Sequence, residues 1–151
     1  VHLMVEDVKD YIEQYIALKP LFITIHYEAC KDKNQVKELL DYIKKNDIKC
    51  GLSIKPATKV EEIYEFLPYL SLFLVMTVEP GKGGQKFIES SINKINDLYN
   101  IREQKRYNYI IEVDGGINNQ TIKLVHKVDI AVVGSYITNQ DYQEAIDLLR
   151  K

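Results

Sequence analysis

The sequence predicts an α/β fold of parallel strands covered by helices, and more narrowly a (β/α)8 TIM barrel that lacks its first two β/α units. Two observations carry this prediction. Short apolar runs alternate with segments of helical periodicity along all 151 residues, and glycine-rich turns follow the later runs. Runs that are apolar throughout and joined by helices are typical of parallel sheets buried on both faces. We therefore expect residues 1–151 to form a single domain, the C-terminal six units of the barrel.

The expected strands are rich in Val, Ile, Leu and aromatic residues. They are predicted at 1–5, 21–26, 49–54, 71–78, 109–113 and 130–134. A helix is predicted after each strand, and Thr58 to Glu61 has the pattern of a capping box that opens one of them. The inward residues expected of the helices are, in chain order, Val8, Tyr11, Ile12, Tyr15, Ile16, Val36, Leu39, Leu40, Ile43, Val60, Ile63, Phe66, Leu67, Phe87, Ile92, Ile95, Leu98, Ile122, Val125, Ile146 and Leu149.

The positions of the glycines favour a barrel over a doubly wound sheet. A doubly wound nucleotide site has its glycine-rich turn after the first strand, whereas here the glycines follow the fourth, fifth and sixth runs. In barrels, phosphate often binds where the loops after the last two strands meet a short helix. Gly115, Gly116, Gly134 and Ser135 lie in those loops. A barrel with one side missing would expose two strand edges. Such edges favour association, so a homo-oligomer is one of the expected states.

Composition excludes several classes of protein. The formal net charge of −2, with both signs mixed along the chain, argues against a nucleic-acid partner. No apolar run approaches the roughly 18 residues of a membrane span, and no leader is recognised, so we expect a cytoplasmic location and no membrane partner. Cys30 and Cys50 lack the spacing of a metal or redox motif, and we expect them to be reduced structural thiols.

Candidate site residues cluster at the ends of the predicted strands. Asp114 ends one strand, where barrel enzymes carry catalytic groups, although an aspartate that opens a turn would look the same. His2 lies inside an apolar run and is either a ligand or a packed residue. Gly81, Gly83 and Gly84 leave space for a ligand against the backbone, or form a flexible structural loop. Met4 and Met76 fit the lining of a site as well as they fit a core.

The strand ends read VHLMV, ITIHYEA, CGLSIKPAT, VMTVEPGKGGQKF, IEVDGGI and VVGSYI. In this order and spacing they resemble the ribulose-phosphate 3-epimerase family, from its third strand to its C-terminus. VMTVEPGKGGQ and EVDGGI are the specific motifs, and the other segments support them. Lys82 departs from the family, which usually has an aromatic or aliphatic residue there. The serine and the His-x-Asp pair that the family carries before its third strand are not in this sequence, so we expect the chain alone to be inactive.

The resemblance implies a ribulose-phosphate-binding barrel and a metal-dependent epimerase of the pentose phosphate pathway. The reaction would invert C3 of D-ribulose 5-phosphate to give D-xylulose 5-phosphate, through an enediolate and two proton-transferring carboxylates. Asp114 would be one of those carboxylates, and His2 and Asp114 would ligate one divalent ion of zinc, iron, cobalt or manganese. His26 matches a family position to which no catalytic role is assigned. The sugar phosphate would contact His2, Gly81, Lys82, Gly83, Gly84, Asp114, Gly115, Gly116, Gly134 and Ser135, with Met4 and Met76 lining the site.

Two alternatives to this function stay open. The same barrel could act on a related hexulose phosphate or another phosphate ester. The chain could also be a non-catalytic fragment or pseudoenzyme that binds a sugar phosphate or a partner subunit without turnover.

Overall fold

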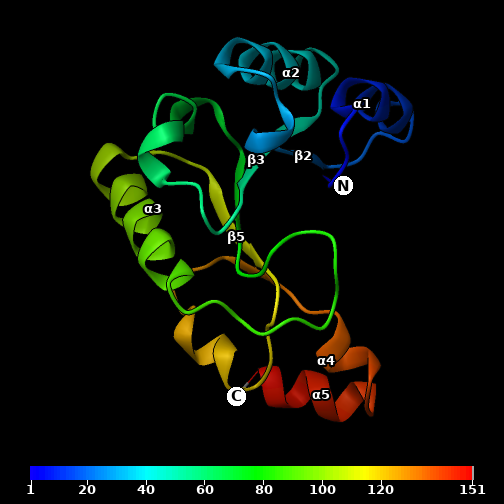
Figure 1. Ribbon diagram of the computed structural model, residues 1–151, viewed down its shortest axis with the longest axis vertical. Coiled ribbons are helices and arrows are strands. Elements are labelled where there is room, and N and C mark those ends of the chain that lie inside the picture. The colour runs from blue at the N-terminus through cyan, green and yellow to red at the C-terminus, as the bar shows by residue number, and fades with distance from the viewer. Residues whose placement is uncertain (151) are drawn as a thin grey trace.

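The structure, a computed structural model, describes residues 1–150 and contains one sheet of six parallel strands in the order β1-β2-β3-β4-β5-β6 (Figure 1). The strands are β1 (His2–Leu3), β2 (Phe22–His26), β3 (Lys49–Ile54), β4 (Leu72–Met76), β5 (Ile110–Asp114) and β6 (Ile130–Val132). Every neighbouring pair is parallel. The predicted fold class is therefore confirmed, and each strand lies within one residue of a predicted run, although β1 and β6 are shorter than expected.

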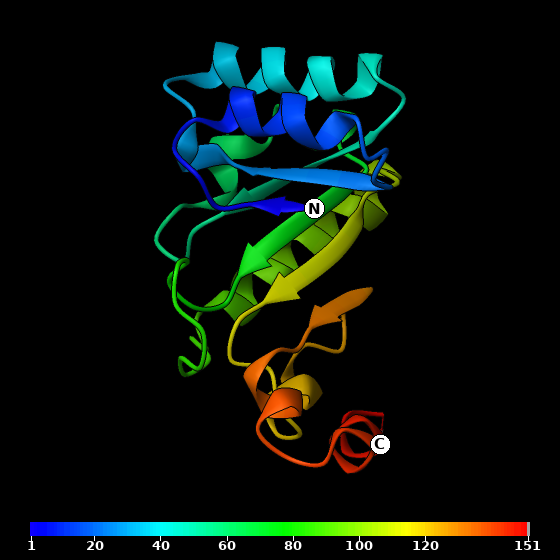
Figure 2. The ribbon, with the colours of Figure 1, turned by 90° about the vertical axis from the view of Figure 1, so that its right-hand side faces the viewer.

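Helices connect the strands and cover one face of the sheet. The α-helices are α1 (Val8–Ile16), α2 (Lys33–Lys45), α3 (Ser91–Lys105), α4 (Ser135–Thr138) and α5 (Tyr142–Leu149). Short 3-10 helices complete the connections, namely η1 (Tyr27–Ala29), η2 (Val60–Ile63), η3 (Leu67–Tyr69) and η4 (Thr121–Leu124). The strand arrows in Figure 2 point toward the side on which the loop after β4 lies, so the carboxyl ends of the strands face this loop.

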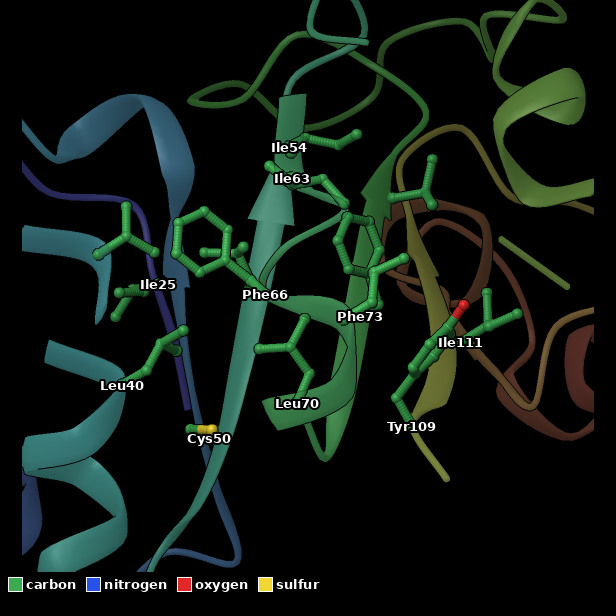
Figure 3. Close-up of a cluster of buried hydrophobic side chains, with 14 of the residues drawn as sticks. Ile25, Leu40, Cys50, Ile54, Ile63, Phe66, Leu70, Phe73, Tyr109 and Ile111 are labelled. Carbon is green, nitrogen blue, oxygen red and sulfur yellow. The ribbon is translucent and has the colours of Figure 1, made fainter. Parts of the chain in front are cut away.

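Alternate residues of each strand face two different layers, as the period of two requires. The outward residues pack with the helices into the main core, which includes Ile25, Leu40, Phe73, Tyr109 and Ile111 (Figure 3). The inward residues of β4 form a second cluster of Leu72, Leu74 and Met76, against which Phe22 and Ile110 pack. The sheet thus has a helix-covered outer face and a concave inner face with its own apolar floor.

On the inner face, the Thr24 side chain of β2 occupies the space beside Gly51 of β3. Thr24 and Gly51 are direct partners in the register, and a Cβ atom added at Gly51 would lie 2.3 Å from Thr24 Oγ1. Only glycine fits this position without moving the threonine. The pair is consistent with a sheet that curls toward its inner face.

Several predicted helices differ from the observed ones. The capping box at Thr58 does not open an α-helix, because the Thr58 hydroxyl donates to Glu28 and the chain forms two 3-10 helices instead. The inward residues predicted there, Val60, Ile63, Phe66 and Leu67, are nevertheless buried. Phe87 lies in the loop ahead of α3, and the segment with Ile122 is a 3-10 helix. Tyr11, predicted to face inward, is 40% exposed.

Strands β1 and β6 are the two edges of the described sheet. On the inner face of β6, Ile130 and Val132 are each 38% exposed. The residues that the structure describes contain no helix with the length and hydropathy needed to cross a membrane. Cys30 and Cys50 are both free thiols.

Candidate functional site

The inner face becomes polar at the carboxyl ends of the strands. Leu3, Ile25 and Val113 belong to the outer core, so the residues next to them, His2, His26 and Asp114, face inward. Ser53 occupies the corresponding position at the end of β3. Polar groups from four strands therefore meet at one end of the concave face, which is where parallel α/β folds bind ligands.

His2 and Asp114 approach each other, as the sequence predicts. His2 Nδ1 lies 3.7 Å from Asp114 Oδ2, although β1 and β5 are separated by three other strands. Four steps across a flat sheet would span about 19 Å at the usual strand spacing. The contact therefore requires strong curvature, and it shows that the sheet curls as part of a barrel does.

These two side chains could hold a metal ion. Imidazole nitrogen and carboxylate oxygen are ligands that suit zinc, iron, cobalt or manganese, so the donors present fit the ion that the sequence implied. Among the residues that the structure describes, no third His, Cys, Asp or Glu joins them in a cluster able to hold a metal. By itself the pair would supply only part of a ligand set.

All of the other predicted site residues line, together with Asp114, one cavity of about 450 Å³. They are Met4, Met76, Gly81, Lys82, Gly83, Gly84, Gly115, Gly116, Gly134 and Ser135. His2 is not among the lining residues, and it reaches the cavity only through its contact with Asp114. A second cavity of about 510 Å³ shares Met4 and Gly81 with the first and is also lined by His26, Glu28 and Lys55. A third, of about 680 Å³, shares Gly84, Gly116 and Ser135 with the first.

Two different structural features explain why glycines occupy these positions of the site. A Cβ atom added at Gly81, Gly83, Gly84 or Gly134 would meet nothing within 4 Å, so these positions leave open space beside the backbone. A Cβ at Gly115 would instead lie 2.4 Å from a Val78 methyl group. At Gly116 it would lie 2.5 Å from the backbone nitrogen of Phe87. At Gly115 and Gly116 the protein itself therefore fills the space that a side chain would need.

Sequence reasoning missed two residues that hold the site in shape. Gln85 Nε2 donates to the carbonyl oxygens of Glu79 at 2.6 Å and Lys82 at 2.8 Å, which ties both sides of the glycine loop together. The Thr77 backbone N–H donates to the carbonyl of Asp114 at 2.9 Å, and its hydroxyl donates to the same oxygen at 3.0 Å. Gln85 lies within the GGQ motif, which was a signal that could have identified it.

Glu28 and His26 form a second polar group beside the site. The carboxylate of Glu28 accepts from the backbone N–H of Lys55 at 2.7 Å and from the Thr58 hydroxyl. Burial alone would raise the pKa of Glu28, but its contact with His26 and these hydrogen bonds outweigh burial and lower the pKa to about 2. His26 Nε2 lies 2.8 Å from His2 Nε2, and the two rings are stacked with centroids 4.9 Å apart. Nothing in the local sequence indicated this network, which connects β1, β2 and η1 with the segment that follows β3.

Stability should depend on the ionisation of Glu28. Because its pKa is lower in the folded state than the usual 4.5, Glu28 stabilises the fold above pH 4.5, and this stabilisation is lost as the pH falls toward 2. Glu28→Gln removes the charge, and we expect it to lower the free energy of unfolding at neutral pH by on the order of 2 kcal/mol, less near pH 2. Urea unfolding at a series of pH values measures both effects.

Glu65→Gln is the matched control, because Glu65 pairs with Lys33 at 2.6 Å on the exposed surface. Exposed ion pairs contribute little, so this variant should change the free energy of unfolding by less than about 0.5 kcal/mol. Equal losses of unfolding free energy in Glu28→Gln and Glu65→Gln would contradict the stabilising role of the Glu28 carboxylate.

Comparisons with known proteins agree with the architecture. The chain superposes on Mycobacterium tuberculosis tryptophan synthase with a TM-score of 0.60 over 95% of this chain and 52% of that chain. Only 12% of the residues are identical, so this likeness concerns the fold alone.

Sequence comparison is more specific. The chain is 37% identical to the ribulose-phosphate 3-epimerase of Candida glabrata over 99% of its length, and 38% identical to that of Treponema pallidum over 89%. It is 36% identical to the Bacillus subtilis ribulose-phosphate 3-epimerase over 99% of its length. The chain spans 59%, 62% and 70% of these three relatives. The sequence profile of the ribulose-phosphate 3 epimerase family matches residues 1–138, and the chain therefore belongs to this family.

Proposed function

We propose that this chain provides the metal-binding and phosphate-binding side of an epimerase that interconverts D-ribulose 5-phosphate and D-xylulose 5-phosphate. The observation that carries the proposal is the 3.7 Å approach of His2 and Asp114 beside a cavity lined by glycines. Inversion of a carbon next to a ketone needs proton transfer on both faces of the carbon and stabilisation of the negative oxygens that form. In this site, Asp114 is proposed to transfer the proton on one face of the carbon, and the ion held by His2 and Asp114 is proposed to stabilise those oxygens.

Asp114 is the group proposed to move a proton at C3. Its carboxylate stands at the inner rim of the cavity, and the Thr77 hydrogen bonds to its backbone carbonyl fix the strand end that carries it. His2 and Asp114 are proposed to hold one divalent ion, which when bound would stabilise negative charge on the substrate oxygens. The curvature of the sheet makes both side chains available at one point.

The sugar phosphate is proposed to lie along the glycine loop. Open space beside Gly81, Gly83 and Gly84 lets a ligand approach the backbone amides, and Gly134 and Ser135 offer further donors across the same cavity. Lys82 adds a positive charge to this loop. Met4 and Met76 are proposed to contact the sugar from the apolar side of the cavity.

The proposal is tested with the whole protein in D₂O. Incubation with ribulose 5-phosphate should exchange the C3 hydrogen for deuterium and produce xylulose 5-phosphate, both followed by NMR. Deuterium exchange into a hexulose phosphate but not into ribulose 5-phosphate would show that the related hexulose phosphate is the substrate. Binding of ribulose 5-phosphate without exchange or inversion would indicate a pseudoenzyme and contradict the proposed activity.

Three further properties belong to the proposal. The reaction would place the protein in the pentose phosphate pathway, and the expected location is the cytoplasm. A homo-oligomer is also proposed, although the first two units of a complete barrel would cover the exposed apolar residues Ile130 and Val132 on β6 as well as a second copy would.

A further inference from the structure

A continuous row of four side chains leads away from the proposed metal ligands. Asp114 Oδ2 lies 3.7 Å from His2 Nδ1, and His2 Nε2 lies 2.8 Å from His26 Nε2. His26 Nδ1 in turn lies 3.6 Å from Glu28 Oε2. Each imidazole therefore has one polar neighbour at each ring nitrogen. In such a row, the proton position on one ring decides the proton position on the next.

Glu28 determines which ring nitrogen of His26 carries the proton. Its Oε1 atom accepts from the Lys55 backbone N–H and the Thr58 hydroxyl, which leaves Oε2 for His26. Oε2 and His26 Nδ1 are both buried, and neither has another hydrogen-bond partner within residues 1–150. At 3.6 Å the two atoms are at ion-pair distance, slightly beyond a normal hydrogen bond. A carboxylate can only accept, so the proton of neutral His26 belongs on Nδ1.

The proton on His26 then determines the state of His2. With Nδ1 protonated, Nε2 of His26 is an acceptor, and the 2.8 Å contact requires a donor on His2. Nε2 of His2 therefore carries the proton, and Nδ1 of His2 keeps its lone pair. That lone pair faces the carboxylate of Asp114. Asp114 does not compete equally for the proton, because its side chain is 27% exposed and can accept from water, whereas Glu28 Oε2 is buried with no other partner among the described residues.

We propose that His26 and Glu28 are positioning residues that hold His2 in its Nε2–H tautomer, so that the Nδ1 lone pair is available next to Asp114. A ligating histidine commonly donates its other ring N–H to a fixed acceptor, which sets the ring orientation and the tautomer. Here the acceptor is a second histidine, held by a buried carboxylate. The use of the lone pair for a metal rests on the proposed function, whereas the tautomer of His2 does not.

Glu28→Gln should reverse the whole row. The amide oxygen keeps the contacts with Lys55 and Thr58, so the amide NH₂ group takes the place of Oε2 and donates to His26 Nδ1. His26 then carries its proton on Nε2 and donates to His2. His2 must shift its proton to Nδ1, which removes the lone pair that faces Asp114.

The tautomers can be measured directly in the metal-free chain. It contains three histidines, and the third, His126, is exposed after η4, takes no part in this row and serves as an internal reference. Ring ¹⁵N NMR at alkaline pH should show His2 as Nε2–H and His26 as Nδ1–H. Both assignments should reverse in Glu28→Gln and stay unchanged in the Glu65→Gln control.

A wild-type spectrum with His2 in the Nδ1–H form would overturn the proposal, and it would do so even if Glu28→Gln failed to fold. An unchanged His2 tautomer in a folded Glu28→Gln variant would overturn it as well. Neither result depends on substrate, metal or turnover. If the tautomers behave as expected and the whole protein does not epimerise ribulose 5-phosphate, the proposed function fails while the positioning row stands.

Zn²⁺ titration tests the use of the lone pair. Followed at the His2 ring nitrogens, zinc should perturb Nδ1 of the wild-type chain, and its affinity should fall about 10-fold to 100-fold in Glu28→Gln. Equal zinc affinity in a folded variant whose His2 tautomer has reversed would overturn the link between the row and the metal site.

Discussion

Asp114→Asn in the whole protein is expected to lower the rate of epimerisation by about 10²-fold to 10⁴-fold, because the variant loses a proton-transfer group at C3 while keeping its shape. A larger loss would follow if the metal ion were released as well. Binding of the sugar phosphate should suffer less, since the glycine loop, Gly134 and Ser135 line the same cavity and keep their backbone donors in the variant. NMR in D₂O measures inversion and exchange, and calorimetric titration measures substrate affinity.

Asp97→Asn is a suitable control, because it makes the same chemical change on the exposed surface of α3. Its rate should equal that of the wild type. Near-normal turnover by Asp114→Asn would remove Asp114 from the proton transfer. Equal losses of binding and of turnover would instead indicate that Asp114 only shapes the site.

Gly116→Ala should destabilise the fold by about 2–5 kcal/mol. The residue has φ +65°, a left-handed conformation that costs a side-chain-bearing residue roughly 1–2 kcal/mol. The added Cβ would also lie 2.5 Å from the nitrogen and 2.8 Å from the Cα of Phe87, and overpacking against backbone typically costs about 1–3 kcal/mol. Urea unfolding measures the change in free energy.

Gly84→Ala separates these two contributions. Gly84 has a similar φ of +72°, but a Cβ there meets nothing within 4 Å. It should therefore show only the conformational cost, about 1–2 kcal/mol or less in an exposed loop. If the two variants lost the same stability, the close approach of Phe87 to Gly116 would not be the reason for glycine at that position.

Much of the fold could be predicted because it depends on local patterns. The apolar runs located all six strands, and the periodicity of α2 identified Val36, Leu39, Leu40 and Ile43, which are all buried. The approach of His2 to Asp114 was also predictable, since the carboxyl ends of parallel strands gather at one end of a barrel.

Other features depend on contacts between distant residues. Thr58 looks like a helix cap in the local sequence, but its hydroxyl donates to Glu28, which lies 30 residues earlier in the chain. The role of Glu28 could not be recognised for the same reason, because its hydrogen-bond donors Lys55 and Thr58 lie in the segment after β3. Phe87 was predicted to lie on a helix because its spacing fits one, yet the glycine-rich loop extends past it and α3 begins at Ser91.

The contact between His2 and Asp114 joins the first strand of the sheet to the fifth, so it exists only while the strands between them keep their curl. Local opening of β2, β3 or β4 would separate the two side chains without changing either one. A ligand that bridges them therefore binds the folded sheet and not the opened one, and mass action makes it stabilise every strand in between. Hydrogen exchange of the β2 to β4 amides should slow on addition of such a ligand, far from the atoms that it touches.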